Sequence, residues 1–230
     1  MFFNPYYLIF MAPAFLLMLY AQWRVRSAYG KWSKVDNNRR MTGAEAAQSL
    51  MTQNGLYGVS IQGIAGNLSD NYDPRKKTLN LSEGSASGSS VASLAIVAHE
   101  IGHAQQDASG SALMALRTGI VPAVNIGSQA GPWLVFLGLI LHFDALMWLG
   151  IGLFSLAFVF ALVTLPVELD ASKRAMSMLT TSGFLVGNEE QKGAKAVLDA
   201  AAMTYIAGLM MVVMQLLYYL VLAGSGRRRR

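Results

Sequence analysis

The stretch His99-Glu100-Ile101-Gly102-His103 places two histidines four positions apart, with a glutamate beside the first. On a helix of 3.6 residues per turn, side chains at this spacing share one face, so both imidazoles can reach one ion. The stretch therefore predicts a zinc site on a helix from Val91 to about Asp107, with Glu100 placed to take a proton from a water that the metal activates. The alternative is a buried helix with two hydrogen-bonded histidines.

The composition is that of a membrane protein. Hydrophobic residues make up 53% of the chain and charged residues 13%, which is typical of a polytopic membrane protein and not of a soluble domain. No Lys or Arg precedes the first apolar stretch, which indicates an uncleaved anchor instead of a signal peptide. Four stretches approach the roughly 20 residues that a membrane helix needs: Tyr6 to Trp23, Gly119 to Leu141, Ala145 to Val167 and Ala200 to Ala223.

Basic residues suggest an orientation. Apart from the C-terminal run, they lie between Trp23 and Gly119 or between Glu168 and Ala200, so the positive-inside rule puts both regions in the cytoplasm. We therefore expect a multi-pass protein of the cell membrane with its site on the cytoplasmic side. The basic run Arg227 to Arg230 opposes this orientation. After a fourth complete span it would lie on the outer side of the membrane, where the positive-inside rule does not expect Arg residues. Basic residues beside spans meet anionic lipid, and we expect no nucleic-acid partner.

A catalytic zinc usually has three protein ligands and one open position. The absence of cysteine leaves His, Glu and Asp as the strong ligands, and the candidate third ligand is Glu168 in Leu165-Pro166-Val167-Glu168. Pro166 is suited to the first turn of a helix, so a new helix is expected there. Two spans separate His103 from Glu168, which puts both on one side of the membrane and predicts one zinc per chain. Alternatively, Glu168 is a first-turn or interfacial acid.

The apolar stretches divide the chain into expected parts. Within the polar region, Thr42-Gly43-Ala44-Glu45 predicts a capped helix that Asn54-Gly55 ends. Strands are expected near Tyr57 to Gln62 and from Lys77 to Ser82, the second with one exposed face. The expected parts are an anchor (1–23), a catalytic region (24–118), a transmembrane hairpin (119–167), a third-ligand helix with its connection (168–199), and a C-terminal transmembrane helix with a basic tail (200–230).

A series of short motifs runs along nearly the whole chain: Asn4-Pro5, Thr42 to Glu45, Asp73-Pro74-Arg75, Leu81-Ser82-Glu83-Gly84, Ala98 to Ala104 and Leu165 to Glu168. In this order they resemble the YugP-like membrane zinc metallopeptidases. More distantly, the chain is similar to HtpX-type and CAAX-processing gluzincin membrane proteases, in which a Glu-x-x-Ala-Asp motif supplies the third ligand. Ser172 occupies the position of that Asp, which would orient a ligand histidine, and Asp107 or Asp170 are candidate substitutes.

The resemblance implies a mostly helical membrane protein with a small α+β zincin-like region, its active helix beside a short sheet. It implies a gluzincin-type zinc endopeptidase whose polypeptide substrate pairs with an edge strand. That edge would be Leu79, Asn80 and Leu81, which could instead merely pack into the domain, and Arg174 or Tyr72 could stabilise the oxyanion. The sequence leaves the oligomeric state undetermined.

Two other functions stay open. One is a noncatalytic, zinc-stabilised membrane scaffold or adaptor, and the other is a zinc hydrolase that acts on lipid instead of peptide. The third histidine, His142, lies in the connection between the second and third spans. The expected topology puts it on the face opposite the motif, so we do not expect it to be a ligand.

Overall fold

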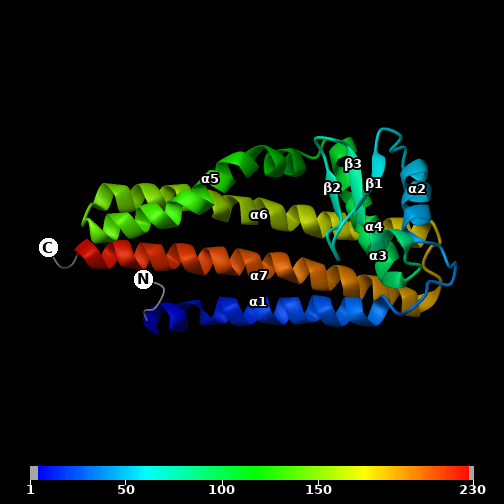
Figure 1. Ribbon diagram of the computed structural model, residues 1–230, viewed down its shortest axis with the longest axis horizontal. Coiled ribbons are helices and arrows are strands. Elements are labelled where there is room, and N and C mark those ends of the chain that lie inside the picture. The colour runs from blue at the N-terminus through cyan, green and yellow to red at the C-terminus, as the bar shows by residue number, and fades with distance from the viewer. Residues whose placement is uncertain (1–4, 228–230) are drawn as a thin grey trace. The chain divides into compact units, whose positions relative to one another are not determined.

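The computed structural model describes residues 5–227, and helices predominate in this part of the chain (Figure 1). Four of its helices are long and apolar enough to cross a membrane, and they contain the four stretches that the sequence predicts, except for Leu141, which follows the second of them. The mostly helical fold with a small sheet is therefore confirmed. The elements are α1 (Pro5–Trp32), α2 (Gly43–Gln53), β1 (Ser60–Ile64), β2 (Asn71–Asp73), β3 (Thr78–Ser82), α3 (Glu83–Ser87), α4 (Val91–Ala108), α5 (Ala112–Ile140), α6 (Asp144–Thr181) and α7 (Gly187–Arg227).

Helix α6 does not stop where the sequence suggests. Pro166 lies inside it, so the expectation that this proline begins a new helix is wrong. A membrane helix can absorb an internal proline, because neighbouring groups can satisfy the backbone carbonyl that the proline leaves without a donor. The third apolar span and Glu168 therefore belong to one continuous helix. Of the C-terminal basic run, Arg228 to Arg230 lie outside the described residues, as does Asn4.

The backbone groups into two compact units. The first comprises the chain up to Ala21, Leu116–Leu165 and the chain from Thr204 onward. Its core is built from apolar and aromatic side chains of the long helices, including Met11, Val135 and Phe154. Glycines allow α5 and α6 to touch there, since a Cβ on Gly127 would lie 2.4 Å from the carbonyl oxygen of Leu153. Small residues at such crossings are typical of packed membrane helices.

The second unit comprises Gln22–Ala115 and Pro166–Met203, and it holds the sheet and the shorter helices. The predicted capping box of α2 is present: the Thr42 hydroxyl accepts from the Glu45 backbone N–H, and the Glu45 carboxylate accepts from the Thr42 backbone N–H. The helix ends at Gln53 with Asn54 as its C-cap, and Gly55 follows with a φ of 68°, a left-handed conformation that glycine adopts without strain.

The sheet has the order β1-β3-β2, with β3 parallel to β1 and antiparallel to β2. The expectation that Leu79, Asn80 and Leu81 form an edge is therefore wrong, because β3 is the central strand. The predicted exposed face is also wrong, since the polar side chains of Thr78 and Ser82 are buried as well as those of Leu79 and Leu81. The cause is β2, a three-residue strand that pairs Tyr72 with Leu79 and has no alternating pattern of its own to predict it.

Helix α4 is the buried centre of the second unit and lies beside the sheet (Figure 1). The Ser90 hydroxyl accepts a hydrogen bond from the backbone N–H of Ser93, which caps the first turn. Leu94, Val97 and Ile101 are fully buried and fix the rotation of the helix about its axis. The rigid packing of these side chains holds the other face of α4, which carries His99 and His103, in one orientation.

Candidate metal centre

Two elements supply the group of residues that could hold a metal ion. Helix α4 presents His99 and His103, and α6 presents Glu168, whose side chain is almost completely buried. The Oε2 atom of Glu168 lies 3.1 Å from Nε2 of His99 and 3.5 Å from Nε2 of His103. One potential ligand atom from each of the three residues lies within 4.8 Å of the others. The predicted ligand set is therefore brought together in space.

A glycine permits this approach of α4 and α6. A Cβ atom at Gly102 would lie 2.6 Å from the backbone carbonyl oxygen of Ala171, far inside normal contact distance. Gly102 lies between the two histidines, and Ala171 lies one helical turn beyond Glu168. The absence of a side chain at position 102 thus lets the two backbones meet where the candidate ligands converge.

The donor atoms fit zinc. Two imidazole nitrogens and one carboxylate oxygen are donors that Zn²⁺ commonly takes, and three protein ligands leave a fourth tetrahedral position for substrate or water. The two imidazole rings stand nearly perpendicular at 83°, with ring centres 4.8 Å apart, so both Nε2 atoms can turn towards the same carboxylate oxygen. His99 and His103 need no large side-chain movement to share an ion with Glu168.

The other nitrogen of each ring has a neighbour of its own. Nδ1 of His99 lies 3.2 Å from the Ser172 hydroxyl, and Nδ1 of His103 lies 3.0 Å from Oε1 of Gln106. Ser172, at the position of the family's Asp, thus still contacts a candidate ligand. No role for Gln106 is predicted from the sequence. Its position three residues beyond His103, which puts it on the same helix face, is the signal that could have indicated one.

The two aspartates considered as substitutes bond elsewhere. Asp170 accepts hydrogen bonds from Gln106 Nε2 at 2.9 Å and from Arg174 Nε at 2.7 Å. Asp107 accepts a hydrogen bond from the Tyr72 hydroxyl at 2.6 Å and pairs with the Lys77 ammonium. Among the hydrogen bonds seen in residues 5–227, neither carboxylate reaches a ligand histidine directly.

Glu100 is the second carboxylate of the site, and only 8% of its surface is exposed. Burial raises the pKa of its carboxyl group, the nearby imidazoles of His99 and His103 oppose that rise, and the charges of Glu168 and Asp70 add to it. For His103, burial disfavours the protonated ring, but the hydrogen bond to Glu168 and the charge of Glu100 outweigh burial and raise its pKa. The site thus concentrates negative charge in a buried place, which favours a cation.

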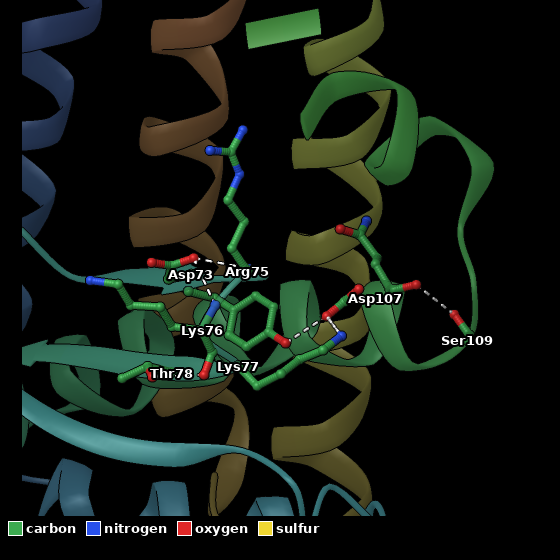
Figure 2. A network of polar contacts seen from close by, with 9 residues as sticks. Asp73, Arg75, Lys76, Lys77, Thr78, Asp107 and Ser109 are labelled. Atoms are coloured by element: carbon green, nitrogen blue, oxygen red, sulfur yellow. Dashed lines mark hydrogen bonds and ion pairs between the residues drawn. The ribbon is translucent and has the colours of Figure 1, made fainter. Parts of the chain in front are cut away.

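Figure 2 shows the network in which Lys77 faces Asp107. The turn between β2 and β3 is held by the Asp73 carboxylate, which accepts from the backbone N–H groups of Arg75 and Lys76. Because the single hydroxyl hydrogen of Tyr72 is donated to Asp107, this arrangement leaves Tyr72 without a hydrogen for an oxyanion.

The remaining candidates lie as follows. The Arg174 side chain is 34% exposed and uses Nε for Asp170, so its guanidinium has other N–H groups that could donate. Asn80 donates its side-chain amide to Asn71, within the sheet. His142 adopts a φ of 51° in the connection between α5 and α6 and belongs to the first unit, whereas the candidate ligands all belong to the second.

A helix-borne His-Glu-x-x-His motif, the Glu168 carboxylate beside it and four membrane-length helices point to the class of membrane-bound zinc metallopeptidases. The chain belongs to the family described as "Putative neutral zinc metallopeptidase", which it matches over residues 7–224. It is also 40% identical over 220 residues to the "Putative membrane protease YugP" of Bacillus subtilis (strain 168), covering 95% of this chain and 97% of that protein. No solved structure matches it. The predicted family is confirmed, and the chain is a membrane protein.

Proposed function

We propose that the chain is a membrane-embedded, gluzincin-type zinc endopeptidase that cleaves membrane or membrane-associated polypeptides. His99, His103 and Glu168 would hold one Zn²⁺ per chain, and Glu100 would be the general base. The observation that carries the proposal is the convergence of three potential ligand atoms within 4.8 Å beside a second buried acid, Glu100, in a chain of a zinc-peptidase family.

The ion, when bound, would supply Lewis acidity that polarises a peptide carbonyl and makes water easier to deprotonate. Glu100 takes the proton of the attacking water and passes it to the nitrogen of the leaving amine. A carboxyl whose pKa is raised by burial is suited to this shuttle, because it holds a transferred proton better than an exposed glutamate does. Arg174 is the proposed donor to the oxyanion, since its guanidinium has N–H groups beyond the one bound to Asp170.

The proposed location is the cell membrane, with the catalytic residues on the cytoplasmic side. The support is the distribution of Lys and Arg, which flank the expected spans on the side of the motif. Polypeptides anchored in the same membrane would be held near the site by confinement to the bilayer. The substrates are accordingly expected to be membrane or membrane-associated proteins.

The test is proteolysis by purified protein reconstituted in liposomes, with wild type beside Glu100→Gln. The variant should lose activity by about 10²–10⁴-fold, the usual contribution of a general base, while its zinc content stays at the wild-type level. Glu189→Gln is the matched control, because Glu189 is an exposed glutamate in the first turn of α7. Proteolysis at the wild-type rate by Glu100→Gln would contradict the proposed mechanism, and full cellular function of that variant would favour the scaffold alternative.

A further inference from the structure

A chain of hydrogen bonds leads from His103 through α4 to α6. Nδ1 of His103 lies 3.0 Å from Oε1 of Gln106. The Nε2 atom of Gln106 donates to the backbone carbonyl of Val167 at 2.8 Å and to Oδ2 of Asp170 at 2.9 Å. Arg174 donates from Nε to the same Asp170 oxygen at 2.7 Å. Gln106 itself is 1% exposed, so water cannot replace these partners.

These partners allow one orientation of the Gln106 amide. The carbonyl of Val167 and the carboxylate of Asp170 can only accept hydrogen bonds, and they take both hydrogens of the Gln106 NH₂ group. The reversed amide would set its oxygen against these two acceptor oxygens in a buried place, which loses both hydrogen bonds and leaves the amide oxygen without a donor. The amide oxygen must therefore face His103.

An oxygen acceptor beside Nδ1 determines which ring nitrogen carries the hydrogen. Nδ1 must be the protonated nitrogen, because the Gln106 oxygen has no hydrogen to give. In the neutral imidazole the lone pair then lies on Nε2, the atom that faces Glu168. Arg174 contributes at the far end by donating from Nε to the same oxygen of Asp170, which fixes the position of that carboxylate.

We propose that Gln106 is a positioning residue that fixes the Nδ1–H tautomer of His103, through the acceptors Val167 and Asp170, and so presents Nε2 to the metal. The proposal rests on the metal site of the proposed function. Gln106 does not touch the reacting atoms, and its effect is on metal affinity, since a ring held in the other tautomer carries a hydrogen on Nε2 and has no lone pair there for the metal.

His99 provides the internal comparison. Its Nδ1 lies 3.2 Å from the Ser172 hydroxyl, which can either donate or accept. Ser172 therefore orients the His99 ring without deciding its tautomer. The two ligand histidines are thus held differently, and the loss of Gln106 should weaken the site more than the loss of Ser172.

The experiment measures zinc affinity by chelator competition on the full-length protein in detergent, together with ¹⁵N spectra of histidine-labelled protein. The spectra are simple because the chain has three histidines. Gln106→Leu should weaken zinc binding about 10–100-fold, the usual effect of losing a group that orients a ligand histidine, and should lose the Nδ1–H signal of His103. Gln105→Leu is the control, because Gln105 lies next to Gln106 but donates to Asn54.

A second pair of variants keeps the test valid if Gln106→Leu folds poorly. Gln106→Glu sets a second oxygen against Asp170 and should weaken zinc binding. Adding Asp170→Asn supplies an NH₂ donor to that oxygen and should restore much of the affinity.

Three results would overturn the proposal. If Gln106→Leu binds zinc with wild-type affinity and keeps the His103 signal, the role of Gln106 is wrong but the metal site itself stands. The absence of rescue in the double variant, with its fold intact, would do the same. A wild-type protein that binds no zinc, or binds it equally without Glu168, would overturn the metal site of the proposed function as well.

Discussion

At the scale of single residues, the proposed metal site predicts that the group beside Nδ1 of each histidine affects zinc affinity. Ser172 makes one neutral hydrogen bond to His99, and a bond of this kind contributes about 1 kcal/mol. We expect Ser172→Ala to weaken zinc binding by no more than about tenfold, as measured by chelator competition. Ser177→Ala is the control, since Ser177 is exposed on the same helix. A loss far beyond tenfold would show that Ser172 does more than orient the ring.

The sequence predicts the grouping of His99, His103 and Glu168, because helix periodicity relates the histidines and topology returns Glu168 to their side of the membrane. Their role as ligands stays a prediction. Gln106 could not be found in this way, because its importance depends on Val167 and Asp170, which the fold brings to it from α6. Its spacing of three residues from His103 indicates a shared helix face, but it gives no sign of the partners in α6.

At the scale of elements, the crossing of α4 and α6 determines whether the site can form. Gly102→Ala would place a methyl group 2.6 Å from the Ala171 carbonyl oxygen, and such overpacking typically costs about 1–3 kcal/mol. We expect a lower unfolding temperature and weaker zinc binding. Gly152→Ala is the control, because a Cβ at Gly152 of α6 meets nothing within 4 Å, and it should be neutral or slightly stabilising. Equal behaviour of the two variants would contradict the close crossing.

The hairpin of β2 and β3 is tied to α4 through Tyr72 and Asp107. Burial raises the pKa of the Tyr72 phenol, and its hydrogen bond to Asp107 raises it further. The folded chain therefore keeps a proton that the unfolded chain releases near pH 10, the ordinary tyrosine value. The resulting stability is complete below about pH 10 and is lost as the pH rises from there towards the folded-state pKa.

Tyr72→Phe removes this titration, so its stability should fall less steeply than that of the wild type as the pH rises above about 10. Thermal unfolding in detergent across alkaline pH, with the two proteins side by side, measures the difference. Tyr57→Phe is the control, because the Tyr57 side chain is 82% exposed. Parallel curves for wild type and Tyr72→Phe would contradict the link between Tyr72 and Asp107.

The sheet marks the limit of prediction from local patterns. Alternation of Leu79 and Leu81 with polar residues predicts a strand correctly but says nothing about its neighbours. The short strand β2 pairs with one edge of β3, and β1 pairs with the other. The strand predicted to lie at an edge is therefore the central strand of the sheet. Strand order depends on pairing between distant segments, and three residues such as Asn71–Asp73 carry too little pattern to reveal it.

At the scale of the whole molecule, the proposed orientation can be tested with single cysteines, because the chain has none of its own. Tyr57 in the second unit and Phe143 between α5 and α6 are 82% and 56% exposed. We expect Phe143→Cys to react with a membrane-impermeant maleimide in intact cells, and Tyr57→Cys to react only after the cells are opened. The reverse pattern would show that the site faces outward, as the basic run ending at Arg230 would suggest.

The spans themselves were predictable, because hydrocarbon thickness sets both their length and their apolar composition. The ends of the helices were not: α1 continues to Trp32, α6 runs past Pro166, and α7 begins at Gly187. Polar turns beyond a span carry no hydropathy signal, although they belong to the same helices. Glu168 lies in such an extension of α6, where apolar composition alone could not assign it to a helix.

The most direct test of the central claim is the zinc content of purified protein in detergent, measured by elemental analysis for wild type, Glu168→Ala and His142→Ala. The account predicts about one zinc per chain in wild type and in His142→Ala, since a site with three protein ligands does not need the third histidine. It predicts much less zinc in Glu168→Ala. Equal zinc in all three proteins, or no zinc in folded wild type, would contradict a site built from His99, His103 and Glu168.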